Sequence, residues 1–204
     1  MSLRSYLLGS LLAALALPAF AQAPQGTPTR IRGTVERLDG QALVVKSRDG
    51  ADVSIALAPN YSVSGVAKRG IADIKPGAFI ASTSVKGADG KLRALEVHIF
   101  PDAMRGQVPE LQAPWDLVPD SVMTNAVVTG IVTGEQGELV KMTYKGNETE
   151  VVVPADIPIV TYVPGDPGLL KPGAAVFIFA LKQPDNTLTA ARITAEKDGV
   201  KPPM

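Results

Sequence analysis

The sequence repeats one pattern of strands and turns, so the chain must adopt a fold that a unit of about 70 residues can form twice. The segment RIRGTVERLDGQALVV begins at Arg30 and aligns with AVVTGIVTGEQGELVK, which begins at Ala126. In this register Val35 matches Val132, 97 residues later. After one deletion, IKPGAFI aligns with LKPGAAV and DGKLRALEV aligns with DNTLTAARI. A register that holds through several motifs indicates an internal duplication.

Each copy contains short segments with strand character, separated by turn residues. In the first copy, Asp-Gly pairs at 39–40, 49–50 and 89–90 are typical of tight hairpins, because such pairs tolerate positive backbone angles. A longer excursion over 58–77 is expected to contain a short helical turn at 70–74. The strands predicted for the first copy are 30–38, 42–47, 52–57, 78–86 and 91–100.

This pattern predicts an all-β protein: two tandem small OB-like β-barrels joined by an ordered proline-rich belt, after an N-terminal signal peptide. Closure into barrels would leave no exposed strand edges. The alternative fold for each copy is a small β-sandwich. The expected segments are the signal peptide 1–21, a flexible tail 22–29, the first barrel 30–100, the belt 101–125, the second barrel 126–197 and a C-terminal tail 198–204.

The first residues have the features of a secretory signal. Arg4 precedes the apolar stretch YLLGSLLAALAL, and Pro18 ends it. Cleavage is expected after Ala21, with Ala23 as a second choice. The chain has no cysteine, which excludes a lipid-anchored lipoprotein and thiol catalysis. We therefore expect a periplasmic or secreted protein with no integral membrane segment in the mature chain.

Charge is balanced overall but uneven along the chain. There are 20 basic and 20 acidic residues, so a nucleic-acid partner is not expected. Segment 30–99 has eleven basic and seven acidic residues, whereas 100–125 has one basic and four acidic. These opposite signs favour an arrangement in which the belt lies across the first segment.

The only histidine, His98, and the only tryptophan, Trp115, lie on either side of the start of the belt. Strand alternation puts Val97 on the core face and His98 on the opposite face with Glu96, facing solvent or the underside of the belt. Histidine and carboxylates together can bind transition metals. The candidate metal ligands are Glu96, His98, Asp102 and Asp116.

The speculative ligand-binding residues are His98, Arg105 and Trp115. The indole of Trp115 can anchor two modules to each other or form a platform on which a ligand stacks. Arg105 is the only basic residue of the belt. It can pair with Asp102 or Asp116, or hold an anionic ligand together with Arg93 or Lys91, and these alternatives stay open.

Enzyme motifs are missing from the sequence. There is no Gly-x-Ser-x-Gly elbow, no phosphate-binding Gly-Lys-Ser/Thr loop and no His-Glu-x-x-His motif. We therefore expect no enzymatic activity, no catalytic residues and no cofactor.

The combination of ALEVHIFPDAMRG, PWDL, MTNA, IVTYVPGD and LKPG resembles an uncharacterised family of exported Gram-negative bacterial proteins with duplicated small β-barrel modules of the domain-of-unknown-function, OB-like type. The resemblance covers the whole mature chain and implies export, but it brings no activity. The leading hypothesis is a binding or adaptor module for an unknown envelope protein or a small ligand. The alternative is a periplasmic metal-binding or metal-transport accessory protein that uses Glu96, His98 and the belt carboxylates.

Overall fold

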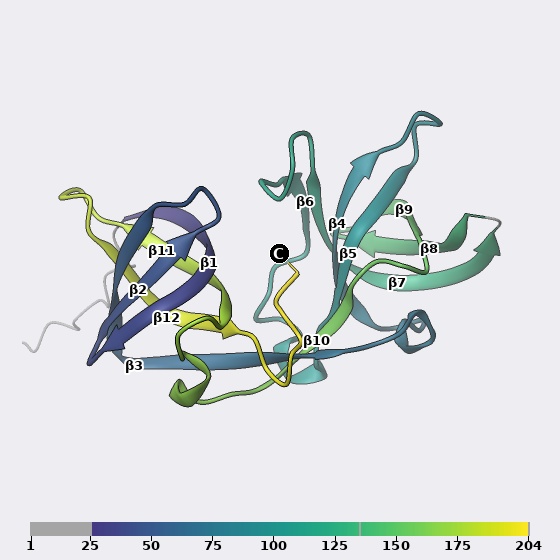
Figure 1. Ribbon diagram of the computed structural model, residues 1–204. Coiled ribbons are helices and arrows are strands. Elements are labelled where there is room, and N and C mark those ends of the chain that lie inside the picture. The colour runs from purple at the N-terminus through teal and green to yellow at the C-terminus, as the bar shows by residue number, and fades with distance from the viewer. Residues whose placement is uncertain (1–25, 135, 204) are drawn as a thin grey trace, which may run out of the picture.

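The computed structural model describes residues 26–134 and 136–203, and almost all of its regular structure is β-strand (Figure 1). The expected all-β class is confirmed. The proposed signal peptide 1–21, its cleavage site and residues 22–25 of the tail lie outside the described residues. The strands are β1 (Thr27–Asp39), β2 (Ala42–Ser47), β3 (Asp52–Lys68), β4 (Phe79–Lys86), β5 (Leu92–Ile99), β6 (Leu111–Pro114), β7 (Val122–Gly134), β8 (Gly137–Tyr144), β9 (Asn147–Val153), β10 (Ile159–Pro164), β11 (Ala175–Lys182) and β12 (Leu188–Ala195).

The local predictions agree closely with this structure, because they depend on turn chemistry. Gly40 and Gly90 have φ angles of 60° and 80° in the turns after β1 and before β5, as Asp-Gly hairpins require. The described residues contain three short 3₁₀ turns: η1 (Ile71–Asp73), η2 (Asp102–Met104) and η3 (Pro167–Leu169). The first of them is the helical turn expected at 70–74. The predicted excursion over 58–77 is wrong for its first half, because β3 continues to Lys68.

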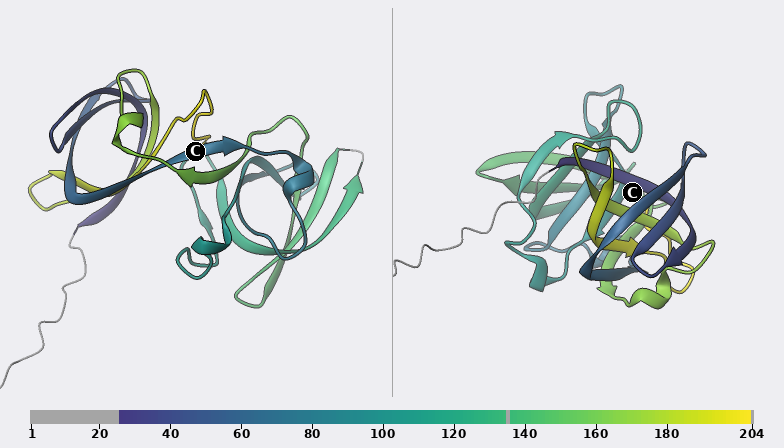
Figure 2. Two further views of the ribbon diagram at one scale, coloured as in Figure 1. Left: turned by 90° about the horizontal axis from the view of Figure 1, so that it is seen from below. Right: turned by 90° about the vertical axis from the view of Figure 1, so that its left-hand side faces the viewer.

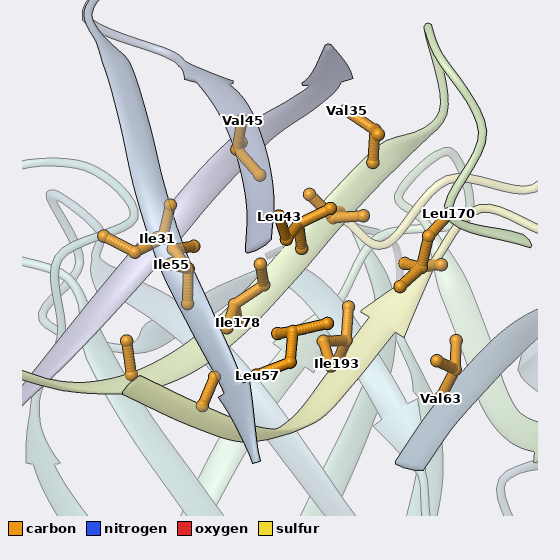
Figure 3. Close-up of a cluster of buried hydrophobic side chains, with 14 of the residues drawn as sticks. Ile31, Val35, Leu43, Val45, Ile55, Leu57, Val63, Leu170, Ile178 and Ile193 are labelled. Carbon is orange, nitrogen blue, oxygen red and sulfur yellow. The ribbon is translucent and has the colours of Figure 1, made fainter. Parts of the chain in front are cut away.

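One closed ring of five strands combines the two ends of the described chain. Strand β1 pairs with β2 and β11, β3 pairs with β2 and β12, and β11 pairs with β12. We call this the split ring, because β1–β3 and β11–β12 are far apart in sequence. Alternating inward residues fill it. Figure 3 shows this apolar core, which includes Ile31, Val35, Leu43, Val45, Ile55, Leu57, Ile178 and Ile193.

A second closed ring contains five strands from one unbroken stretch, 79–153. Strand β4 pairs with β5 and β7, β8 pairs with β7 and β9, and β5 pairs with β9. We call this the continuous ring. Its own apolar core includes Ile80, Val97, Val128, Val140, Met142 and Val151. The two rings form the two lobes in Figure 1.

The barrel boundaries expected from the repeat, 30–100 and 126–197, therefore need correction. Each ring takes three consecutive strands from one half of the chain and two from the other: β1–β3 with β11 and β12, and β7–β9 with β4 and β5. The chain passes from one ring to the other in the segments that follow β3 and β10, and each of these segments contains a Lys-Pro-Gly turn.

The two Lys-Pro-Gly turns make equivalent backbone bonds to the other half of the chain. In the split ring, Gly173 N–H donates to Val35 C=O at 2.8 Å, and Val35 N–H donates to Ala174 C=O at 2.9 Å. In the continuous ring, Gly77 N–H donates to Val128 C=O, and Val128 N–H donates to Ala78 C=O, both at 2.8 Å. Each Lys-Pro-Gly turn thus bonds to the first strand of the other half of the chain. The first strand of either half offers the backbone groups that such a turn needs.

These bonds also correct the register of the repeat in its first strand. Val35 is matched by Val128, and both side chains are 1% exposed, whereas Val132 is 51% exposed. The hairpin between β7 and β8 is longer than the hairpin between β1 and β2. The residues of β1 therefore match those of β7 with a different sequence offset from the one that relates the later strands of the two halves. The later matches hold, since Leu43 and Val140 occupy equivalent core positions.

A two-stranded ribbon connects the rings. The second half of β3 pairs antiparallel with β10, and β10 also pairs with β5 of the continuous ring. Figure 2 shows β3 running from one lobe to the other beside β10. The belt, 101–125, does not join the rings in sequence: it links β5 to β7, both in the continuous ring. The last residues of the belt already belong to β7, which begins at Val122.

Candidate functional site

The junction between the rings is an apolar cluster that includes residues of both rings and of the belt. Phe79 and Phe100 stack with their ring centroids 5.0 Å apart, and Phe100 stacks on Tyr162 of β10 at 5.7 Å. Phe177 of the split ring and Met123 belong to the same buried cluster. This packing, together with the β3–β10 ribbon, holds the outer faces of the two rings against each other.

Beside this cluster lies a pocket of about 430 Å³. One wall is the outer face of the split ring. In the parallel pairing of β3 with β12, Arg192 is opposite Ser62 and Thr194 is opposite Ser64, so these four side chains share one face. Arg30 of β1 adds a second guanidinium to the lining.

The other wall belongs to the continuous ring, the belt and β10, and it is mainly apolar. Two amides, Gln107 and Asn125, interrupt it. Its apolar lining residues are Ala81, Phe100, Met104, Val108, Pro109, Leu111, Met123 and Tyr162. Trp115, Phe177 and Phe179 line the pocket where the belt meets β11. The pocket thus has a cationic, hydroxyl-bearing wall opposite an apolar one.

Trp115 acts as an anchor and also lines the pocket, so the structure combines the two alternatives considered for it. The guanidinium carbon of Arg30 lies 3.8 Å from the centroid of the indole, a cation–π contact. Phe179 packs against the same indole at 6.3 Å between centroids. The indole N–H is buried and has no hydrogen-bond partner among the described residues.

Asp116 fixes the belt electrostatically to the split ring. Its carboxylate accepts a hydrogen bond of 2.8 Å from Arg32 and lies 3.6 Å from Arg30. Arg48 donates to the backbone carbonyls of Asp116 and Leu117 at 2.8 and 3.1 Å. Burial opposes ionisation of Asp116, but the Arg32 hydrogen bond and the two positive charges outweigh it and hold its pKa below the ordinary value. The belt does lie across the basic first segment, as the charge pattern favoured.

His98 and Glu96 lie on the predicted face of β5, but that face is covered. His98 is 0% exposed and Glu96 is 1% exposed, so of the two alternatives for His98, solvent or the underside of the belt, the solvent-facing one is wrong. The Nε2 atom of His98 lies 2.8 Å from Glu96 Oε2, although the two groups are not aligned for a hydrogen bond. Thr83 donates its hydroxyl proton to the other carboxylate oxygen.

Tyr162 covers His98, with 5.3 Å between the ring centroids. Burial raises the pKa of the Tyr162 phenol far above its ordinary value, and the nearby negative charge of Glu96 adds to the effect. The phenol is therefore protonated at every physiological pH. Because Tyr162 also lines the pocket, the Glu96–His98 pair lies directly behind the pocket wall.

Arg105 is not among the residues that line the pocket. It donates to the backbone carbonyl of Gly77 at 2.7 Å and lies 3.5 Å from Asp102. Of the alternatives left open, its acidic partner is thus Asp102, and it ties the belt to the Lys-Pro-Gly turn. Arg93 is engaged elsewhere, with Asp89 at 3.1 Å.

The four candidate metal ligands do not come together. Glu96 and His98 are adjacent, but Asp102 is 95% exposed beside Arg105, and Asp116 is bound by Arg32. Within residues 26–134 and 136–203, no three His, Cys, Asp or Glu side chains are grouped so that they could hold a metal ion. The arrangement offers two ligands, which is fewer than metal centres in proteins normally use.

Sequence reasoning identified Trp115 as a possible binding residue but missed Arg192, Tyr162 and Phe179. A signal was present for Arg192, because the repeat aligns it with Glu96 on the outer face of the last strand. Phe179 is 54% exposed, which is unusual in a chain with few aromatic residues. The position of Tyr162 depends on β10 crossing β5, which no local pattern predicts.

Comparisons with models of protein families, with curated proteins and with solved structures gave no match. The resemblance to an exported family therefore stays a prediction that depends on the sequence motifs. Within the part of the chain that the structure describes, no helix has both the length and the apolar character needed to cross a membrane.

Proposed function

We propose that this protein is a non-enzymatic binding protein of the cell envelope and that its ligand occupies the pocket between the two rings. The observation that supports this most directly is the pocket itself. Its volume of about 430 Å³ falls within the usual range of small-molecule sites, and its lining is largely aromatic and apolar with a few polar groups. Export through the signal at 1–21 would bring it to the periplasm.

The proposal includes an origin for the two rings. Both have the strand order 1-2-3-5-4 closing on strand 1, with the third and fifth strands parallel, which resembles an OB-like barrel. We propose that a duplicated OB-like module exchanged its last two strands between the copies. The exchange supports a binding role, because the crossing strands β3 and β10 hold the two pocket walls in place.

The proposal is tested with the mature protein and N-phenyl-1-naphthylamine, a neutral apolar dye that fluoresces when bound in an apolar site. Ser64 of β3 is half-buried and lines the pocket, so Ser64→Phe should fill it. We expect this variant to weaken binding of the dye at least tenfold.

The matched control is Ser54→Phe, an exposed position on the same strand that does not line the pocket. It should bind the dye like the wild type. Failure of the wild type to bind the dye, or equal weakening by both variants, would refute the proposed pocket.

A further inference from the structure

We infer that the pocket is built for an amphipathic organic anion, with an acidic head group against the split ring and an apolar or aromatic body against the opposite wall. This inference depends on the proposed function, since it names the ligand class of the same pocket. Three features of the pocket support it: the charge of the lining, the hydrogen-bond donors around it, and the shape of the apolar wall.

The charge of the lining is entirely positive. Among the described residues, the charged side chains that line the pocket are Arg30 and Arg192, and none of the described Asp or Glu residues lines it. Arg30 is partly neutralised by Asp116 at 3.6 Å. Arg192 is exposed and forms no ion pair within the described residues. A guanidinium without a carboxylate partner at the edge of an apolar pocket favours a ligand that carries the missing negative charge.

The donors next to Arg192 suit an acidic head group. Ser62, Ser64 and Thr194 share its face of the sheet, and their hydroxyls make no hydrogen bonds to other described residues. A carboxylate, sulfonate or phosphate has several acceptor oxygens, so it can accept from a guanidinium and from neighbouring hydroxyls at once. We place the head group at Arg192, between these hydroxyls.

The opposite wall suits a single apolar body. Phe100 and Tyr162 stack on each other and present rings to the pocket, while Met104 supplies a flexible thioether that adapts to different shapes. A volume of about 430 Å³ holds one acyl chain or a small fused ring system and leaves no room for a two-chain lipid. The ligand class is thus a small free acid rather than a membrane lipid.

Two dyes with the same aromatic body test the inference in the mature protein. 1-Anilinonaphthalene-8-sulfonate carries a sulfonate, and N-phenyl-1-naphthylamine lacks it. We expect the wild type to bind the anionic dye at least tenfold more tightly. Arg192→Gln should weaken the anionic dye about tenfold and change the affinity for the neutral dye less than twofold. Because Trp115 is the only tryptophan, its fluorescence should decrease by energy transfer as either dye fills the pocket.

The matched control is Arg37→Gln, an exposed arginine of β1 that pairs with Asp39 and does not line the pocket. It should leave both affinities unchanged. Equal affinities of the wild type for the two dyes, or equal weakening of both dyes by Arg192→Gln, would overturn the anion inference and leave the pocket intact. If Ser64→Phe bound both dyes as tightly as the wild type, the pocket itself would be refuted.

A displacement experiment extends the test to simple candidate ligands. Decanoate and decanol have the same apolar chain, and only decanoate carries a charge at neutral pH. Decanoate should displace the bound dye at concentrations at least tenfold lower than decanol. The protein should not sediment with vesicles of phosphatidylglycerol, and sedimentation with them would contradict a pocket limited to small free acids.

Discussion

Replacement of His98 by leucine should destabilise the protein strongly, because it removes the partner of a buried acid. Glu96 is 1% exposed, and in the variant its carboxylate would keep only the Thr83 hydroxyl as a partner. A buried polar group that loses its neighbouring partner typically costs about 1 to 3 kcal/mol, and more when the group left behind is charged. We expect His98→Leu to lower the free energy of unfolding by about 3 kcal/mol or more.

The double variant distinguishes this reasoning from a simple loss of packing. Apolar residues that replace both members of a buried pair are often neutral or stabilising. Glu96→Leu/His98→Leu should therefore be more stable than His98→Leu alone. The matched control is Arg192→Leu, at the exposed equivalent of Glu96 in β12, where a change within about 0.5 kcal/mol is expected.

Urea unfolding of the mature proteins measures these free energies by linear extrapolation. The fluorescence of Trp115 reports on the junction between the rings, close to the pair. The reasoning would be refuted if His98→Leu cost less than about 1 kcal/mol, below the range for a buried polar group that loses its partner. It would also be refuted if the double variant were less stable than either single variant.

Three further predictions concern the exchange, a tight backbone contact and the belt. Cysteines at Thr34 and Ala175, which face each other in the β1–β11 pair, should form an intramolecular disulfide on mild oxidation. Gly33→Ala should cost about 2 kcal/mol or more in urea unfolding, because a Cβ would overlap the backbone of β2. Asp116→Asn should cost about 1 kcal/mol at pH 7, since the Asp116 side chain is partly exposed. The folded state lowers the pKa of Asp116, so its contribution is fully present above about pH 4 and disappears as the pH falls through that lowered pKa.

Each of these predictions has a control. Cysteines at Thr34 and Phe79 would pair only in an unexchanged barrel, so a disulfide between them, and none between 34 and 175, would contradict the exchange. Gly70→Ala would place a Cβ 4.0 Å from Asp73 Oδ2, an ordinary van der Waals contact, and should change stability little. If Asp116→Asn were equally destabilising at pH 2.5 and pH 7, the charge of Asp116 would not be the cause.

The strands could be predicted from the sequence wherever local chemistry decides. The limits of β2 agree with the prediction residue for residue, and the Asp-Gly turns lie where hairpins need them. The partners of the strands could not be predicted, because the two halves have the same pattern. A turn such as Lys75-Pro-Gly77 can dock on the first strand of either half, and no local signal separates the two outcomes.

The candidate site was only partly predictable for a similar reason. Alternation on β5 correctly placed Val97 in the core and His98 on the other face. The burial of His98 depends on Tyr162, which is brought there by β10, a strand whose path follows from the exchange. The sequence indicated Trp115 of the belt, but the cationic wall opposite the belt includes Arg192 of β12, which is far from the belt in sequence.

The split ring has a consequence for the order in which the protein acquires its structure. During synthesis, strands β1–β3 are made before their partners β11 and β12, which follow only after every strand of the continuous ring. The continuous ring is complete before β11 and β12 are made. Until then the sheet of β1–β3 has two unpaired edges. Closure of a ring through such long-range pairing is slow, and unpaired strand edges promote aggregation. We therefore expect this protein to need a holdase chaperone until β11 and β12 are made.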